Sequence, residues 1–252
     1  MKIEIHNTEK KLAEAAARTA IEIMSSAIRE KGNVTIIVAT GASQFDFLES
    51  LTSTSMIDWT KVTMFHLDEY VGISEQHSAS FRKYLRERLI SKVQLDAYYF
   101  IRGDAVNPVA EVDRLNELIS AHSIDVAFVG VGENGHLAFN DPPANFETKS
   151  PYLILPLDKK CRMQQVGEGW FEGIEDVPTQ AISMSIREIL RAQKIICTVP
   201  GERKAKAIRD CFNTEDVSPE YPSSVLKKHS DAYIFLDQDS ASLLSPERRN
   251  NK

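Results

Sequence analysis

Short runs of β-branched and other apolar residues alternate along the chain with segments in which apolar residues recur at helical spacing. The runs are almost continuously apolar, which is typical of strands that are buried on both faces of a sheet. They cover residues 34–38, 62–66, 125–129, 194–199 and 232–236. The pattern therefore predicts buried strands at these places.

The segments between the runs predict helices. In the first segment, Asn7 or Thr8 can cap a helix that ends at Gly32, because short polar side chains favour helix starts and glycine favours helix ends. Its apolar positions fall at helical spacing, at Leu12, Ala16, Ala20, Ile23 and Ala27. Further helices are expected after Ser43, after Ser78, at Pro108 with Asn107 before it, and from Gly201.

Strands that alternate with helices indicate an α/β fold, with right-handed crossovers between parallel strands. We predict a doubly wound, mainly parallel sheet flanked by helices, a modified Rossmann-like arrangement. The chain contains no repeat and no linker rich in proline or glycine, so we expect a single domain over residues 1–252. The polar tail, residues 245–252, is expected to be solvated and frayed.

Composition and charge narrow the classes of partner. The chain has 252 residues with a formal net charge of −6, and its charges of both signs are mixed along the sequence. A nucleic-acid-binding face would need clustered lysine and arginine, so we expect no nucleic-acid partner. The N-terminus has no apolar leader, and no apolar run is long enough to span a membrane. These features predict a cytoplasmic protein without a membrane partner.

Cysteine usage bears on redox state and metal binding. Cys161, Cys197 and Cys211 are widely spaced and include no C-x-x-C pair, which indicates reduced thiols. A structural zinc site would need four ligands at shorter spacing, so no metal is expected. A small-molecule ligand is the expected partner, and a homo-oligomer stays open.

The residues that follow each predicted strand are the candidates for function, because ligands of such sheets bind beyond the carboxyl ends of the strands. The first strand is followed by Thr40, Gly41, Ala42 and Ser43. A glycine allows close approach of a ligand, hydroxyls add hydrogen bonds, and a helix start can bind an anion. A plain turn with a serine cap explains this segment equally well.

The second strand is followed by Asp68 and Glu69. A carboxylate at this place can act as a general base on a proton bound to carbon next to a carbonyl. The alternative is a solvated acidic loop that caps the next helix.

The third strand is followed by the segment Gly130 to Pro142, GVGENGHLAFNDP. Its glycines allow a tight loop that presents His136, and imidazole exchanges protons near neutral pH. Asn134 and Asp141 lie near enough along the chain to hold the ring in one tautomer. The fourth strand is followed by Lys204 near a helix start, against the usual dipole preference, which a bound phosphate would reconcile. The alternative there is a solvated basic helix face.

These segments, taken in order, resemble the glucosamine-6-phosphate deaminase (isomerase) family over nearly the whole chain. The segment Gly130 to Pro142 resembles the family signature G-x-G-x-[DN]-G-H-x-x-F-N-[ED]-P, and residues 65–70, FHLDEY, are similar to its F-x-x-D-E-Y segment. Residues 40–43 resemble the family's phosphate loop, and residues 200–204, PGERK, its later lysine segment.

The resemblance implies an enzyme that converts glucosamine 6-phosphate and water to fructose 6-phosphate and ammonia without a cofactor. It implies that His136 opens the sugar ring and that Asp68 moves a proton between C2 and C1. Asn134 and Asp141 would orient His136, while Thr40 to Ser43 and Lys204 would hold the phosphate, anchoring the reacting carbons.

Three departures from the family stand out. Well-known members have aspartate at the place of Asn134 and glutamate at the place of Asp141, so the imidazolium of His136 should be stabilised less. They also carry a phosphate-binding arginine in the region that matches residues 161–171, here CRMQQVGEGWF, where Arg162 does not fall clearly on that position.

Three other functions stay open. One is galactosamine-6-phosphate deaminase, which differs in the sugar epimer. Another is 6-phosphogluconolactonase, whose family resembles G-H-x-A-S-L-F where this chain has GHLAFNDP. The third is a non-catalytic sugar-phosphate sensor, although no helix-turn-helix segment accompanies the domain and Asp68 and His136 are both present.

Overall fold

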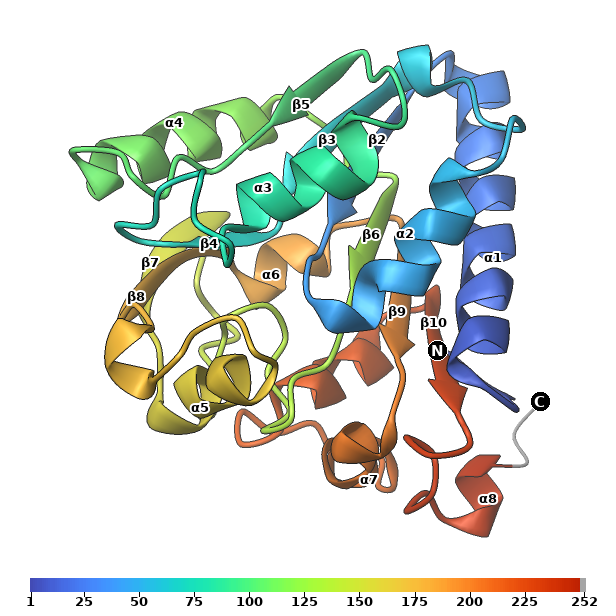
Figure 1. The fold of residues 1–252 in the computed structure, drawn as a ribbon. Helices are drawn as coiled ribbons and strands as arrows, with labels where there is room; N and C mark the ends of the chain where they lie inside the picture. Colours follow the sequence, from blue (N-terminus) through green and yellow to red (C-terminus); the bar gives the residue numbers. More distant parts are fainter. Residues whose placement is uncertain (250–252) are drawn as a thin grey trace.

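The computed structural model describes residues 1–249 and contains a seven-stranded sheet in which every pairing is parallel (Figure 1). In spatial order its strands are β1 (Lys2–His6), β10 (Ala232–Asp237), β9 (Lys194–Val199), β6 (Val126–Val129), β2 (Val34–Val38), β3 (Val62–His66) and β5 (Ala97–Tyr99). The strands predicted from the apolar runs are confirmed, and so is the doubly wound α/β fold.

Helices connect the strands and cover both faces of the sheet. The α-helices are α1 (Glu9–Lys31), α2 (Phe45–Thr52), α3 (Phe81–Leu85), α4 (Pro108–Ser120), α5 (Lys159–Gly167), α6 (Ile186–Ile189), α7 (Ala205–Phe212) and α8 (Pro246–Arg249). One π-helical segment, η3 (Arg86–Ile90), continues α3, and the 3-10 helices are η1 (Ala42–Gln44), η2 (Trp59–Lys61), η4 (Ile174–Asp176), η5 (Glu202–Lys204) and η6 (Pro222–Lys228). No helix in the described residues is both long and apolar enough to span a membrane.

Local sequence sets the ends of these helices. The Thr8 hydroxyl accepts a hydrogen bond from the backbone N–H of Lys11 at the start of α1, and Gly32 ends that helix with φ 82°. Asn107 caps α4 by accepting from two backbone N–H groups, directly before Pro108. Capping and glycine chemistry therefore place these boundaries as the sequence predicts.

Successive residues of the central strands pack on opposite faces of the sheet. Ile37, Phe65 and Ala127 belong to the hydrophobic cluster on one face, and Ile36, Met64 and Phe128 belong to the cluster on the other. This alternation is the period of two expected of a strand with both faces covered. The sheet is therefore a rigid platform for the loops at its carboxyl edge.

A second, antiparallel sheet escapes the apolar pattern. It consists of β4 (Asp68–Tyr70), β8 (Gln180–Met184) and β7 (Tyr152–Pro156), in that order. Only Leu67 separates β3 from β4, so the chain passes from the large sheet to the small one at this residue. Asp68 consequently lies at the junction of the two sheets.

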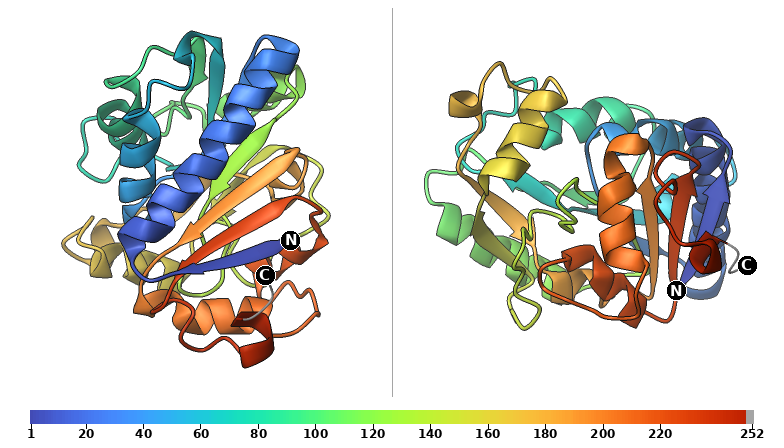
Figure 2. Two further views of the ribbon diagram at one scale, coloured as in Figure 1. Left: turned by 90° about the vertical axis from the view of Figure 1, so that its right-hand side faces the viewer. Right: turned by 90° about the horizontal axis from the view of Figure 1, so that it is seen from below.

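The ends of the described chain pack near each other. β1 pairs along its full length with β10, and Figure 2 shows the two strands side by side at one edge of the sheet. The tail expected to fray from residue 245 instead forms α8, whose Arg249 donates hydrogen bonds to the carbonyl oxygens of Leu244 and Ala241. Residues 250–252 of that tail lie outside the described residues.

Candidate active site

A cavity of about 420 Å³ opens at the carboxyl ends of β2, β3, β6 and β9. Thr40 to Ser43, Asp68, His136 and Lys204 line it together, although each follows a different strand. The order of the strands reverses at β6. Strands β2, β3 and β5 lie on one side of β6, and β9 and β10 lie on the other. The cavity thus lies at the point where ligands bind in open α/β sheets.

Two similar glycine turns flank the β6 loop. Gly41 after β2 has φ 98° and Gly201 after β9 has φ 90°, and each precedes a 3-10 turn that leads into an α-helix. Neither helix start is capped by a side chain. Backbone N–H groups at the two starts therefore remain available to an anion, and Thr40 and Ser43 add hydroxyls beside one of them.

Asp68 lines the cavity and is buried, with a relative exposure of 6%. Burial, assisted by the neighbouring charge of Glu69, raises the pKa of Asp68 to about 8. A carboxyl group that gains and loses its proton near neutral pH is suited to proton transfer.

Glu69, its neighbour, has a different environment. Its carboxylate accepts hydrogen bonds from the Ser80 hydroxyl (2.8 Å) and from three backbone N–H groups, those of Tyr70, Phe81 and Arg82. Two of these N–H groups belong to the first turn of α3. Glu69 therefore holds the start of α3 and does not line the cavity. The two adjacent carboxyl groups differ because alternate residues of β4 face opposite sides.

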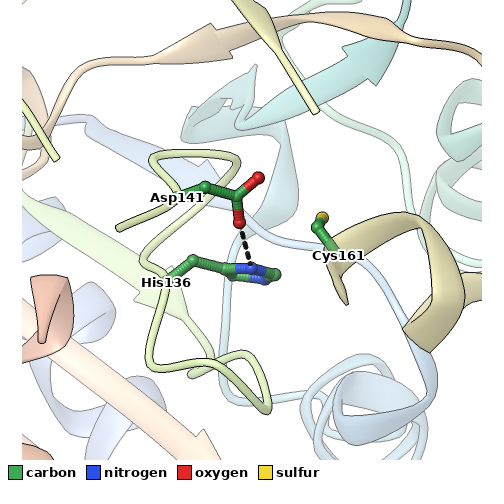
Figure 3. Close-up of side chains that lie close together, drawn as sticks. All are labelled: His136, Asp141 and Cys161. Carbon is green, nitrogen blue, oxygen red and sulfur yellow. Dashed lines mark hydrogen bonds and ion pairs between the residues drawn. The ribbon is translucent and has the colours of Figure 1, made fainter. Parts of the chain in front are cut away.

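His136 is fixed by the loop that follows β6. Its Nδ1 lies 3.1 Å from Asp141 Oδ1, a contact drawn as a dashed line in Figure 3. Its backbone N–H donates to Asn134 Oδ1. The Asn134 amide also donates to Asp141 Oδ1 at 2.8 Å. Asn134 and Asp141 thus both act on His136 although they do not line the cavity. The shorter Asp141 side chain reaches the imidazole.

Asp141 keeps its charge despite its surroundings. Burial would raise the pKa of Asp141, but hydrogen bonds from His136, from Asn134 and from the Asp158 backbone N–H outweigh it and lower the pKa. A carboxylate beside Nδ1 favours the tautomer with its proton on Nδ1 and leaves Nε2 free for a substrate.

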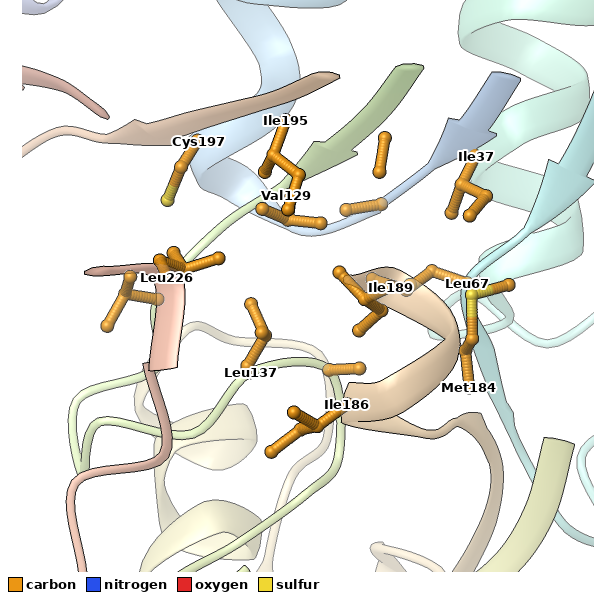
Figure 4. Packing of buried hydrophobic residues seen from close by; sticks show 14 of the residues in the cluster. Ile37, Leu67, Val129, Leu137, Met184, Ile186, Ile189, Ile195, Cys197 and Leu226 are labelled. Atoms are coloured by element: carbon orange, nitrogen blue, oxygen red, sulfur yellow. The ribbon is translucent and has the colours of Figure 1, made fainter. Parts of the chain in front are cut away.

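The loop geometry depends on glycine and on an apolar anchor. A Cβ atom on Gly132 would lie 2.3 Å from His136 Nε2, so only glycine leaves room for the ring, and Gly135 has φ 86°. Leu137, directly after the histidine, is fully buried and packs in the hydrophobic cluster with Val129 and Ile186 (Figure 4). The imidazole therefore sits on a well-packed support.

Lys204 is a basic residue that lines the cavity and is buried, with a relative exposure of 9%. Burial lowers its pKa, while the charges of Glu168 and Glu133 act in the other direction. No ion pair involves its ammonium group within residues 1–249. A bound anion would supply the partner that this buried cation lacks.

One wall of the cavity was not predicted. Gln164, Gln165 and Glu168 of the α5 region line it, and Gln165 accepts a hydrogen bond from the Tyr70 hydroxyl at 2.8 Å. Arg162 points elsewhere, because its guanidinium donates to the carbonyl oxygens of Ile174 and Val177. The arginine that lines the cavity is Arg203, paired with Glu133 at 2.7 Å. The sequence signal for this wall was that residues 161–171 match the family region that carries a phosphate-binding arginine.

Comparison with known proteins agrees with this geometry. Residues 7–235 match the family described as glucosamine-6-phosphate isomerases/6-phosphogluconolactonase. The chain therefore belongs to this family. A glucosamine-6-phosphate deaminase of Exiguobacterium sibiricum is 35% identical over 238 residues, covering 94% of this chain and 92% of that protein. One of Streptococcus sanguinis is 36% identical over 227 residues, covering 90% and 94%. The predicted family resemblance is confirmed.

Solved structures of the family share the fold. The structure of a monomeric glucosamine-6-phosphate deaminase superposes with a TM-score of 0.87 at 27% identity, covering 96% of this chain and all of that one. A 6-phosphogluconolactonase of Trypanosoma brucei has a TM-score of 0.79 at 17% identity, covering 97% and 98%. At that identity the second likeness concerns the fold alone.

Proposed function

We propose that the protein is a hexosamine-6-phosphate deaminase that converts glucosamine 6-phosphate and water to fructose 6-phosphate and ammonia. The observation that carries the proposal is that buried Asp68 and the Asp141-held imidazole of His136 line one cavity. The 35–36% identity to glucosamine-6-phosphate deaminases over nearly the whole chain supports the same activity.

The substrate phosphate binds between the two glycine turns. The backbone N–H groups and hydroxyls of Thr40 to Ser43 meet it from one side, and Lys204 meets it from the other. The phosphate supplies the negative charge that compensates the buried ammonium group. This grip fixes the sugar so that its reacting carbons face Asp68 and His136.

His136 acts first, as the group that opens the ring. Nε2 takes the proton of the anomeric hydroxyl and a proton is returned to the ring oxygen, which yields the open-chain aldehyde. Asp141 stabilises the transient imidazolium through Nδ1, and Asn134 holds Asp141. Ring opening needs no cofactor, because it consists of proton transfers between the sugar oxygens and a side chain.

Asp68 acts second, as the base at carbon. Its carboxylate removes the proton from C2 while the aldehyde oxygen takes a proton from the C2 ammonium group, which gives a 2-amino enol, and the resulting acid returns the C2 proton to C1. The C2 imine that results is hydrolysed by water, so that ammonia leaves and the ketone of fructose 6-phosphate remains. Burial strengthens Asp68 as a base, since the raised pKa makes its carboxylate bind protons more tightly.

The test is an assay of ammonia release from glucosamine 6-phosphate, with galactosamine 6-phosphate and 6-phosphogluconolactone in parallel. We expect ammonia from a hexosamine phosphate with the parent protein and none with Asp68→Asn. Folding of the variant is checked by circular dichroism. Hydrolysis of the lactone without ammonia release would show a lactonase instead, and binding of hexosamine phosphate without turnover would show a sensor.

A further inference from the structure

Three side chains with different metal-binding atoms converge beside the cavity. His136, Asp141 and Cys161 each place one nitrogen, oxygen or sulfur atom within 4.8 Å of the other two. Figure 3 shows the three gathered around one small space, the first two from the loop after β6 and Cys161 from α5. The wide separation along the sequence hides this grouping from any motif search.

The spacing suits a tetrahedral cation. Two nitrogen or oxygen ligands, each about 2.0–2.1 Å from zinc at tetrahedral angles, are about 3.3 Å apart. His136 Nδ1 and Asp141 Oδ1 are 3.1 Å apart already. A thiolate at about 2.3 Å from the metal would lie about 3.5 Å from each, so Cys161 needs a shift on the order of 1 Å. Cys161 is in the first turn of α5, where a rotation of its side chain can supply part of that shift.

The surroundings suit a bound cation as well. Cys161 has a relative exposure of only 1%, and the other two side chains are also largely shielded from solvent. Imidazole with thiolate is the donor set that zinc and related soft cations prefer. His136 also lines the open cavity, so a cation can reach the group from the substrate side.

We propose that His136, Asp141 and Cys161 form an inhibitory site for a thiophilic divalent cation such as Zn²⁺, with water as the fourth ligand. Binding forms a bond from the cation to Nδ1, to the Asp141 carboxylate and to the Cys161 sulfur. The thiol proton and the Nδ1 proton leave to solvent, Nε2 takes up one proton from solvent so that the imidazole stays neutral, and no electron is transferred.

A cation on Nδ1 changes the tautomer of the His136 imidazole and thereby inhibits the enzyme; this step rests on the proposed function. With a cation on Nδ1, the imidazole carries its proton on Nε2 and cannot accept one from the anomeric hydroxyl. Ring opening therefore stops, although Asp68 and the phosphate grip are untouched. The cation occupies the place of the proton that Asp141 holds in the active form.

Binding is tested first, without any assay of turnover. Zn²⁺ is titrated calorimetrically into the whole protein, and Co²⁺ is added to record the absorption band of a cobalt–thiolate bond. We expect one Zn²⁺ per chain and a thiolate band. The variants C161S and C161A should lose the band and weaken Zn²⁺ binding at least about 100-fold, because loss of even an outer-shell partner costs 10- to 100-fold in metal affinity.

The matched control is C211S, which alters a thiol that is equally hidden from solvent but lies outside the group. It should bind both metals as the parent does. A parent protein without the band, or C161S and C161A with unchanged Zn²⁺ affinity, would overturn the site. Circular dichroism of each variant separates loss of binding from loss of fold.

Inhibition is tested second, by ammonia release against equimolar Zn²⁺. We expect loss of most activity in the parent, restoration by a chelator, and insensitivity of C161S relative to its own metal-free rate. Full activity with Zn²⁺ bound would overturn the inhibitory role. A thiolate band together with no ammonia under any condition would support the metal site while rejecting the proposed deaminase.

Discussion

At the scale of single residues, the site separates two adjacent carboxyl groups by environment. Asp68 is buried at the cavity with few compensating contacts, whereas Glu69 is buried among four hydrogen-bond donors. Burial and the charge of Glu69 raise the pKa of Asp68 to about 8. Both the rate of proton transfer and the free energy of unfolding should therefore respond to pH through Asp68.

The first prediction concerns the pH dependence of kcat/KM. Asp68 must be deprotonated to remove the C2 proton, so kcat/KM should rise with pH, reach half of its plateau near pH 8 and level off above that pH. Replacing Glu69 by glutamine removes the neighbouring negative charge, which should shift this rising limb to lower pH. The measurement is a pH–rate profile of both proteins. An ascending limb centred near pH 4 in the parent would contradict it.

The second prediction concerns stability. Unfolded Asp68 ionises near its ordinary pKa of 3.8, whereas folded Asp68 ionises near 8, so ionisation opposes folding increasingly between these values. Above pH 8, Asp68→Asn should therefore raise the free energy of unfolding by at least about 1 kcal/mol, since one pKa unit corresponds to about 1.4 kcal/mol. Near pH 4 the two proteins should differ little.

Urea denaturation at pH 4.5 and pH 9 measures this difference. The control is Asp113→Asn, which neutralises an exposed carboxylate on α4 and should change little at either pH. If Asp68→Asn is less stable than the parent at pH 9, other groups in the folded protein must stabilise the ionised Asp68 carboxylate, which would contradict the prediction.

The sequence could predict the residues whose chemistry is local. Thr40, Asp68, His136 and Lys204 each lie in the segment that follows a strand of the parallel sheet, and the common edge of that sheet then brings them to one cavity. It could not predict that Glu69 holds α3, because both carboxyl groups are adjacent and only their side of β4 differs. Cys161 was unpredictable for another reason: its neighbours His136 and Asp141 are far away in sequence.

At the scale of elements, α5 connects the cavity wall to the His136 loop. The Asp158 side chain caps α5 by accepting from the Cys161 backbone N–H, and the Asp158 backbone N–H donates to Asp141. Gln164 accepts from the Glu133 backbone N–H at 3.0 Å. A change that destabilises α5 should therefore also weaken substrate binding.

The third prediction tests this connection. Asp158→Ala removes the helix cap, which should cost about 1 kcal/mol of stability. If that energy is lost from α5, KM should rise about fivefold, since 1.4 kcal/mol corresponds to a factor of ten. Asn107→Ala is the matched control, because it removes the cap of α4, which lines no part of the cavity.

Thermal denaturation and steady-state kinetics on both variants give the answer. Both should lose similar stability, and only Asp158→Ala should raise KM. Equal KM values in the two variants would mean that loss of the α5 cap does not affect substrate binding.

The sequence predicted helices and strands that have long apolar or amphipathic patterns. It did not predict strands that are short or that lack a continuous apolar run. Strands β2, β3 and β9 match the apolar runs residue for residue. Strands β4 and β5 have three residues each, too few to establish a period. Strands β7 and β8 pair with each other, and the chain segment between them contains α5. No local sequence pattern therefore marks either strand.

At the scale of the whole molecule, surface composition bears on assembly. The exposed large apolar residues in the described chain are spread over several separate elements, with Met56 after α2, Met163 on α5 and Leu243 before α8. A stable homodimer usually buries a more continuous apolar surface.

The fourth prediction is that the protein is a monomer at micromolar concentration. Light scattering coupled to size-exclusion chromatography should give a mass near 28.3 kDa. A stable mass of twice that value would show that the polar surface supports an interface. Dilution should leave a monomer unchanged, so a mass that falls on dilution would also count against the prediction.

The pairing of β1 with β10 has a consequence for the order of assembly during synthesis. β1 precedes the other strands of the sheet in the chain, and its partner β10 follows them all, more than two hundred residues later. Until β10 has been synthesised, the backbone amide groups of β1 stay exposed to water. The strands from β2 to β9 can already pair during this time. The edge that closes last lies beyond β9, on the side of the Lys204 turn. A nascent chain should thus possess the His136 loop before its sheet is complete.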